Sequence, residues 1–235
     1  MKAKRKMKLT DTSLLLLITV VVFFAMYIGA ILFQGKGFLK PQTFFNILNA
    51  ALIIISCGMS LVMITGGIDI SVGGVVALVS MCCAVYLDYH GGNIFGAIGI
   101  SLLIGLGFGL VQGYLVAYLD IQPFIVSLAG VFFARGMTTI VNTNPFNVAN
   151  EQFVALKDTR ITIPGMGSVN KLGNYVNAYI EIGVVVALLV VILLFCVLRF
   201  TKFGRKFYAV GGNSQSALML GINVKRTKFF AYLIC

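Results

Sequence analysis

The sequence predicts an all-α polytopic membrane protein with about six transmembrane helices. Of its 235 residues, 59% are hydrophobic and 11% are charged, and the mean hydropathy is +0.99. Apolar stretches also recur at the length that a bilayer core about 30 Å thick requires, roughly 20 helical residues each. This composition excludes a soluble globular domain, a disordered chain and a small disulfide-stapled scaffold.

Six apolar stretches are candidate spans. The four with full length are residues 14–33, 44–64, 94–119 and 179–198. Two others are weaker candidates, because 72–87 is short and 124–141 contains a cation, Arg135. A further apolar run begins at Phe229 and the sequence stops at Cys235, so we expect residues 229–235 to be the start of a seventh span in a longer protein.

Positive charge is concentrated in two segments. Five of the 18 Lys and Arg residues lie in 1–13 and seven lie in 199–228. Basic segments stay in the cytoplasm, and six spans return the chain to its starting side, so we expect a cytoplasmic tail at 1–13 and a cytoplasmic coupling segment at 199–228. The bundle would cover 14–198, with 142–178 as an extracytoplasmic loop that is either a connector or a docking surface. This distribution of charge does not indicate a nucleic-acid partner.

A glycine-rich segment separates the second and third candidate spans. Residues 65–74 contain four glycines and one carboxylate, Asp69. Helix is not expected to continue through it, and Asp69 or Ser71 is expected to accept hydrogen bonds from free amides at the start of the next helix. Two interpretations remain open: a capped turn between spans, or a broken helix beside a polar pathway. The candidate pathway residues are Gly66, Gly67, Asp69, Ser71 and Arg135.

Arg135 lies about 12 residues into its candidate span, at or beyond the middle of the bilayer. A cation at this depth is costly unless it is paired or hydrated. The possible partners are Asp69, backbone carbonyls of an unwound segment, or a hydroxyl-rich substrate. If residues 124–141 form a re-entrant segment, the Arg135 side chain instead extends to the membrane–water interface.

Small residues recur at every fourth position of the 94–119 stretch: Ala97, Ser101, Gly105, Gly109, Gly113 and Ala117. This spacing predicts close helix packing, with a pore-lining face as the weaker interpretation. Each step of four residues drifts by about 40° around the helix, so one partner helix should meet only three or four of these positions.

Residues 212–222 predict a short capped helix on the cytoplasmic side. Asn213 or Ser214 can cap its first turn, and Gly221 can end it in the left-handed conformation. Apolar residues between basic flanks suggest a contact for a cytoplasmic partner. The candidate contact residues are Gly212, Asn213, Ser214, Ala217, Leu218, Gly221 and Ile222.

Motifs for catalysis and for nucleotide binding are missing from the sequence. It has no phosphate-binding loop, zinc-protease motif or nucleophile elbow, and only one histidine. The five cysteines lie in apolar runs, without the spacing of metal ligands. We therefore predict a non-catalytic chain that binds no metal and no cofactor, so that any energy comes from another protein.

Three motifs together resemble one family. They are GGIDISVG at 66–73, PFIVSLAG at 123–130 followed by Arg135-Gly136, and the run from Phe203-Gly204 through AVGGN at 209–213 to Gly221-Ile222. Over nearly its whole length the chain resembles the permease subunit of bacterial ABC sugar importers of the ribose, galactose and xylose class. Within that class, residues 128–136 and 208–213 are most similar to galactofuranose-type permeases.

The resemblance implies an assembly. It implies about ten spans in a complete subunit, so that this sequence would lack the carboxy-terminal third. Two permease subunits, the same or similar, would form the path for a monosaccharide across the bacterial cytoplasmic (inner) membrane. An extracytoplasmic binding protein would deliver the sugar, and a cytoplasmic ABC ATPase would hydrolyse ATP and press on residues 212–222.

Two other functions remain as alternatives to this importer subunit. A secondary transporter would couple sugar to ion flow through embedded acids or Arg135. A membrane-embedded enzyme would use Asp69 and Arg135 as a polar pair, although the spans offer few candidates for a general base.

Overall fold

The structure is a computed structural model that describes residues 11–34, 42–43, 46, 50–144, 147–169 and 175–235. The described chain is mostly helical, as the sequence predicts. Contacts divide it into two units, one formed by residues 1–48 and 162–179 and the other by 49–161 and 180–235. The predicted basic tail at 1–13 lies almost entirely outside the described residues.

The smaller unit contains helix α1 (Asp11–Gln34) and most of a two-stranded sheet. The strands are β1 (Arg160–Val169) and β2 (Tyr175–Glu181). The amide group of Gln42 pairs with the backbone of Tyr179: the Tyr179 N–H donates to Gln42 Oε1 at 2.9 Å, and Gln42 Nε2 donates to the Tyr179 carbonyl at 3.3 Å. This pair fixes the chain before α3 to strand β2.

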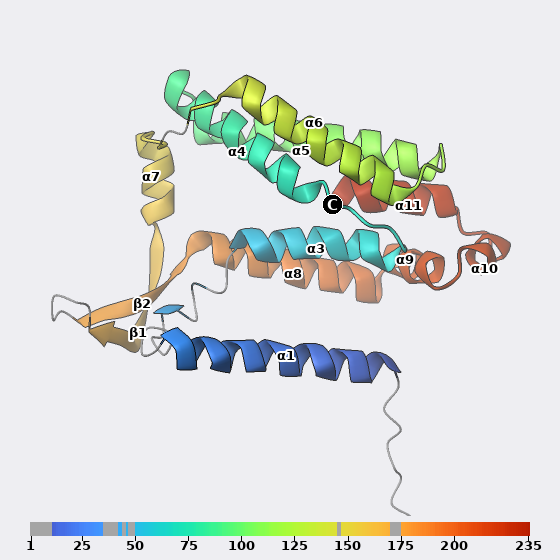
Figure 1. Cartoon of the computed structure of the whole chain (residues 1–235), viewed down its shortest axis with the longest axis horizontal. Coiled ribbons are helices and arrows are strands. Elements are labelled where there is room, and N and C mark those ends of the chain that lie inside the picture. Colours follow the sequence, from blue (N-terminus) through green and yellow to red (C-terminus); the bar gives the residue numbers. More distant parts are fainter. Residues whose placement is uncertain (1–10, 35–41, 44–45, 47–49, 145–146, 170–174) are drawn as a thin grey trace, which may run out of the picture. The chain divides into compact units, whose positions relative to one another are not determined.

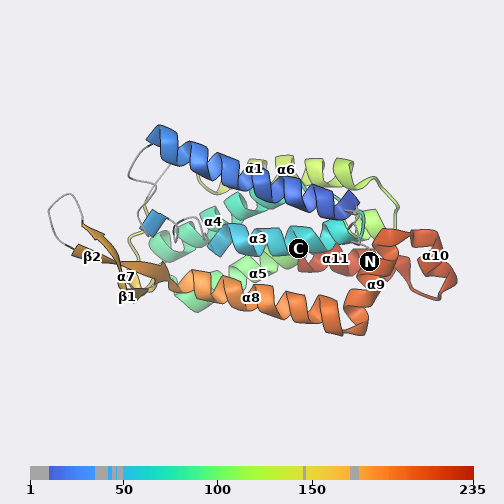
Figure 2. The ribbon, with the colours of Figure 1, turned by 90° about the horizontal axis from the view of Figure 1, so that it is seen from below.

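The larger unit is a bundle of helices. They are α3 (Ala50–Ile64), α4 (Val72–Tyr89), α5 (Ile94–Ala117), α6 (Pro123–Val141), α7 (Glu151–Asp158), α8 (Ile182–Phe200), α9 (Lys202–Gly212), α10 (Ser214–Met219) and α11 (Val224–Ile234). Helix α5 packs against both α4 and α11, α6 packs against α4, and α3 pairs with α8. Figures 1 and 2 both show α3 and α8 side by side.

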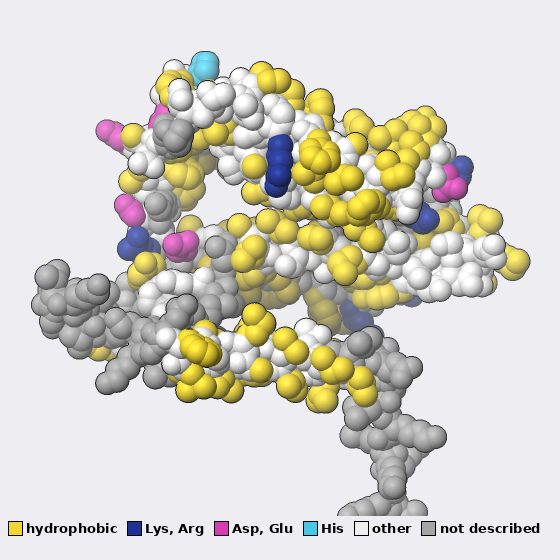
Figure 3. Space-filling model, viewed as in Figure 1, with side chains coloured by type: hydrophobic (Ala, Val, Ile, Leu, Met, Phe, Trp, Pro, Cys, Tyr) yellow, Lys and Arg dark blue, Asp and Glu magenta, His cyan; other side chains and the backbone are white. Residues whose placement is uncertain are grey.

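Within the described chain, five helices are long and apolar enough to cross a membrane: α1, α4, α5, α6 and α8. Helix α3 is apolar but has 15 described residues, because most of the predicted span before Ala50 lies outside the described residues. Many hydrophobic side chains face outward on these helices (Figure 3). An outward apolar surface of this extent suits lipid or other membrane helices rather than water.

The predicted loop 142–178 contains regular structure. It holds α7 and strand β1, and β2 continues to Glu181, so α8 starts at Ile182 rather than at 179. The start of α7 is fixed to the end of α4, because Asp88 Oδ1 accepts the N–H groups of Ala149 and Asn150 at 3.0 Å each. The Asn150 side chain returns a bond of 3.1 Å to the Leu87 carbonyl.

The small residues of α5 meet two different helices. At the start of the helix, Ser101 Oγ lies 3.2 Å from Cys83 Sγ of α4. At its end, a Cβ on Gly109 would lie 3.0 Å from Leu233 Cα, and one on Gly113 would lie 3.0 Å from the carbonyl oxygen of Phe229, both in α11. Gly105, between them, has no described atom within 4 Å of the same position. The drift of the four-residue repeat thus carries the ridge from α4 to α11.

A buried hydrophobic cluster joins the end of α3 to α9 and α11. It contains Leu61 and Val62 of α3, Phe207 of α9 and Tyr232 of α11, all at most 3% exposed. The Phe203 ring contacts that of Phe207 in a tilted arrangement, with a centroid distance of 4.6 Å and an interplanar angle of 48°. The cluster places α9 and α11 against the glycine-rich segment that follows α3.

Candidate functional site

The helix breaks between α3 and α4, as the glycines predict. The N–H of Gly67 bonds to the Val62 carbonyl at 3.0 Å and closes the end of α3. Gly66 has φ +79°, a left-handed conformation that an L side chain adopts only with strain. The chain then runs without regular structure to Ser71 before α4 starts at Val72. We call residues Thr65 to Ser71 the break.

A buried polar network holds the break together. Asp69 Oδ1 accepts the Ser71 N–H at 2.8 Å and the Ser71 hydroxyl at 2.6 Å. Gln112 of α5 donates from Nε2 to Ser71 Oγ at 2.8 Å. All three residues are buried, where bonds to a carboxylate are strong and unpaired polar groups are costly. Of the two predicted acceptors, Asp69 accepts the N–H of Ser71, the residue that precedes α4, whereas Ser71 makes no side-chain cap bond to that helix. The network connects this turn to α5.

Helix α6 also closes on the network. A Cβ on Gly130 would lie 2.6 Å from Gln112 Nε2 and 3.1 Å from Ser71 Cβ, so the close approach requires glycine here. Neither Gln112 nor Gly130 is among the site residues that the sequence predicts. For Gln112 a signal existed, since it is the one amide side chain in the otherwise apolar stretch 94–117.

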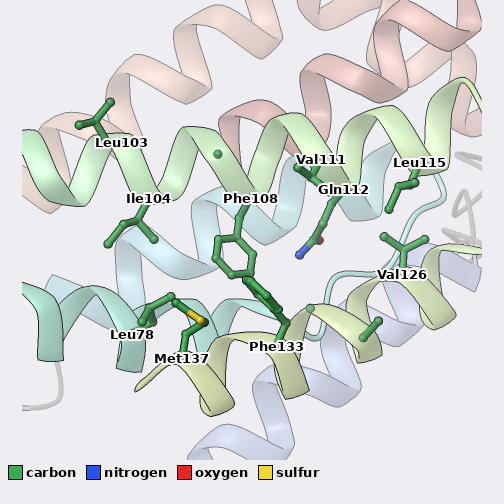
Figure 4. Close-up of a pocket in the computed structure, with 13 residues that line it drawn as sticks. Leu78, Leu103, Ile104, Phe108, Val111, Gln112, Leu115, Val126, Phe133 and Met137 are labelled. Atoms are coloured by element: carbon green, nitrogen blue, oxygen red, sulfur yellow. The ribbon is translucent and has the colours of Figure 1, made fainter. Parts of the chain in front are cut away.

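A cavity of about 540 Å³ opens beside the network, between α4, α5 and α6. Figure 4 shows the Gln112 side chain pointing into it from α5, and Phe108 of α5 meeting Phe133 of α6 at its lining. The two rings are 5.9 Å apart at their centroids. Gln112 is the one polar side chain among the described lining residues. A sugar here would lose most of its hydrogen bonds to water, so the cavity does not suit sugar binding in this conformation.

Arg135 does not pair with Asp69. It lies on an exposed face of α6, whereas Asp69 is buried beside Ser71. Within the described ranges the one ion pair is Arg160 with Asp158, at 3.5 Å. Of the partners that the sequence allowed for Arg135, the structure therefore removes Asp69. Asp69 and Ser71 face each other inside the protein, and of the other candidates Gly66 is exposed and Gly67 half-buried.

The predicted short helix is present as α10. Asn213 caps it by accepting the Ser216 N–H at 2.9 Å. At its other end the N–H groups of Gly221 and Ile222 bond back to the carbonyls of Leu218 and Ala217, with Gly221 at φ +77°. This is the Schellman arrangement that a left-handed glycine permits. Helix α9 before it was not predicted.

An apolar tip projects from this segment. Leu218, Met219 and Leu220 are 65%, 89% and 78% exposed, whereas Ala217 is buried at 1%. Beside the tip lies a groove of about 630 Å³, whose lining includes Asp120, Lys225 and Lys228. The segment therefore combines a rigid capped turn, an exposed apolar end and nearby charges of both signs. Gly212, Asn213 and Leu218 are exposed, while Ser214 and Ile222 are half-buried.

Apolar helices of membrane-spanning length and a break stabilised by buried polar groups define a polytopic membrane protein whose core contains non-helical backbone. The family described as branched-chain amino acid transport system / permease component matches residues 43–235, and the chain belongs to this family. The prediction of a permease component rather than an enzyme is thereby confirmed.

The similar proteins are permeases. The chain is 34% identical over 221 residues to the inner membrane ABC transporter permease protein YjfF of Escherichia coli K12, covering 93% of this chain and 63% of YjfF. It is 36% identical to the fructose import permease protein FruG of Bifidobacterium longum, with 98% and 66% covered. It is 30% identical to the ribose import permease protein RbsC of E. coli K12, with 86% and 60% covered. The chain thus spans less than two thirds of the length of these relatives. No solved structure matches it.

Proposed function

We propose that the chain is the transmembrane permease subunit of an ATP-driven importer that carries a monosaccharide across the bacterial inner membrane. The observation that supports this is similarity along most of the chain to proteins named as fructose and ribose import permeases and as an inner membrane ABC permease. The proposed partners are a cytoplasmic ATPase that binds and hydrolyses ATP, an extracytoplasmic sugar-binding protein and a second permease subunit. The amino terminus would be cytoplasmic.

The proposed path for the sugar runs beside the break. Backbone that is not helical is tolerated at membrane depth only where protein or a water-filled path covers it, and half-helices that meet at such a point are typical of transport sites. In the described conformation Asp69 and Ser71 bond to each other. Their part is therefore to stabilise the break, while Gly66, Gly67 and Arg135 lie closer to the surface and are the candidates to face the path.

The proposed contact with the ATPase is the segment 212–222. A free subunit that leaves Leu218 and Met219 exposed in water gains free energy when a partner covers them. The Asn213 cap and the Gly221 turn hold the segment in one conformation before the partner binds, which lowers the ordering cost of binding. The small residues Ser101, Gly105, Gly109 and Gly113 serve helix packing in this proposal.

The test is reconstitution of the permease with its ATPase and binding protein in liposomes. Uptake of ribose, fructose and galactofuranose would be measured with ATP inside and with a proton ionophore present. We expect one monosaccharide to accumulate only with ATP and to be unaffected by the ionophore. Uptake that needs no ATP and collapses with the ionophore would instead show the secondary transporter.

The contact segment can be tested by Gly221→Val. A β-branched residue at φ +77° is strained and should distort the turn, so we expect sugar-stimulated ATP hydrolysis to disappear while membrane insertion is unchanged. Leu119→Val, at an exposed position outside the segment, is the control. Ala217→Glu should abolish stimulation too, but because Ala217 is buried it would disrupt α10 itself. Unchanged stimulation in Gly221→Val would remove the assignment.

A further inference from the structure

The backbone of α9 lies directly on the end of α3. A Cβ on Gly211 would overlap the carbonyl oxygen of Ile64, the last residue of α3, and would lie 3.6 Å from Cα of Thr65. Thr65 is the first residue of the break. Gly211 is the last residue but one of α9 and stands three positions before α10. The two segments that the sequence singled out separately, the break and the coupling segment, are therefore in direct contact.

A second contact reaches the middle of the break from α11. The Tyr232 hydroxyl donates to the carbonyl of Ile68 at 3.0 Å, and Tyr232 is 3% exposed. A Cβ on Gly67 would lie 2.8 Å from this hydroxyl oxygen and 2.9 Å from Val62 Cγ1, so glycine is needed there for the tyrosine to fit. The bond supplies a donor to an irregular backbone carbonyl inside the bundle.

The two helices that make these contacts pack together against the end of α3. Phe207 of α9 and Tyr232 of α11 belong to one buried cluster with Leu61 and Val62. A ring contact between Phe203 and Phe230, at 6.2 Å, also joins α9 to α11. Close-packed interiors deform little, so a displacement of α10, which lies between α9 and α11 in the chain, reaches the break through both helices.

We propose that Gly211 and Tyr232 are positioning residues that transmit movement of the coupling segment to the break, and this rests on the proposed function. Gly211 bears on the start of the break through the carbonyl of Ile64. Tyr232 holds its centre through the carbonyl of Ile68. Neither residue touches the transported sugar; both set the position of the backbone beside its path.

The experiment measures sugar taken up per ATP hydrolysed, with the complete transporter in liposomes, for Tyr232→Phe and Gly211→Ala. Tyr232→Phe removes one hydroxyl and keeps the ring in the cluster. A lost hydrogen bond of about 1 kcal/mol corresponds to roughly a fivefold change in an equilibrium. We expect binding-protein-stimulated ATP hydrolysis to persist while uptake per ATP falls about fivefold in Tyr232→Phe, and at least as far in Gly211→Ala.

Matched controls separate transmission from folding. Tyr208→Phe removes a hydroxyl from an exposed tyrosine of α9, and Gly99→Ala adds a methyl group where no described atom lies within 4 Å. Both should keep the wild-type ratio. A merely structural role would reduce the yield of assembled transporter without changing uptake per ATP.

The outcomes are distinct for the two proposals. A wild-type ratio in assembled Tyr232→Phe overturns the transmission role, and that variant decides the question even if Gly211→Ala fails to assemble. If the wild-type protein itself shows no ATP-dependent uptake, the proposed function is wrong, and no ratio exists to compare.

Discussion

The break and the end of α10 use the same backbone device in opposite surroundings. Each turns through a glycine in the left-handed conformation, Gly66 at φ +79° and Gly221 at φ +77°. In the break, the polar side chains of Asp69 and Ser71 are buried and bonded to each other. At α10, apolar side chains such as Met219 are left exposed.

The difference shows what each turn still requires. The break has satisfied its polar groups inside the chain, through Ser71 and Gln112, and its stability depends on that network. The turn at α10 has satisfied its backbone through Asn213 and Gly221 but leaves apolar surface without a cover. Variants of the first should therefore affect folding, and variants of the second should affect binding to a partner.

The largest effect is expected from Asp69→Ala. It removes the acceptor of three bonds in a buried position, two from the Ser71 N–H and hydroxyl and a longer one from the Cys235 thiol. A buried donor left without a partner costs about 1–3 kcal/mol, so we expect a loss of about 3 kcal/mol. For a chain of this size that lowers the melting temperature by roughly 10 °C, measured by thermal unfolding in detergent.

The control for Asp69→Ala is Glu151→Ala, which removes an exposed carboxylate from the first turn of α7. Its melting temperature should differ from wild type by about 2 °C at most. If Asp69→Ala melts as the wild type does but transports no sugar, Asp69 serves the path and not the fold, and the contrast between the two turns is lost.

A smaller effect, in a different measurement, is expected from Met219→Ser. Met219 is 89% exposed in the free chain, so its loss should leave the melting temperature unchanged. In complex with the ATPase it would be covered, and losing part of that apolar contact should weaken binding by about 1 kcal/mol, roughly fivefold. Titration of purified ATPase onto the permease in nanodiscs measures this, with Met219→Leu as the apolar control. A lowered melting temperature with unchanged affinity would mean that the tip packs within its own chain.

Local chemistry made both turns predictable from the sequence. Four glycines around Asp69 predicted the break, and Asn213 with Gly221 predicted the ends of α10, because caps and left-handed turns depend on residues a few positions apart. The drift of small residues along α5 likewise follows from helix geometry. Helix α9 was not predicted. The strands are difficult to predict because Pro164 and Gly165 interrupt the alternation of apolar and polar residues in β1.

Partners far apart in the sequence were not predictable. Gln112 meets Ser71 across 41 positions, and Tyr232 meets Ile68 across 164. Gly130 approaches the network and Arg135 remains outside it because of the face that α6 turns toward its neighbours. Spacing along one helix defines its faces, but packing against other helices decides which face is buried.

The smallest effect is expected from Gly73→Ala and Gly212→Ala. Each stands beside a glycine whose fit is tight, since a Cβ on Gly74 would lie 3.3 Å from Ala134 Cβ and one on Gly211 would overlap Ile64. Gly73 and Gly212 have no described atom within 4 Å of the same position. Alanine should fit at both positions. It lowers the conformational entropy of the unfolded chain, so the free energy of unfolding should rise by about 0.5 kcal/mol and the melting temperature by roughly 2 °C.

Sugar uptake by Gly73→Ala gives a second test of the comparison between the break and α10. If the break keeps its described conformation during transport, glycine is needed only where a Cβ would clash with a neighbouring atom. Gly73 has no such neighbour, so sugar uptake by Gly73→Ala should equal that of the wild type. If Gly73→Ala melts normally but slows uptake, the start of α4 needs freedom that the described conformation does not use. The break would then be a moving part in its own right, and its polar network would have to open during transport, whereas the capped turn at α10 moves as one piece.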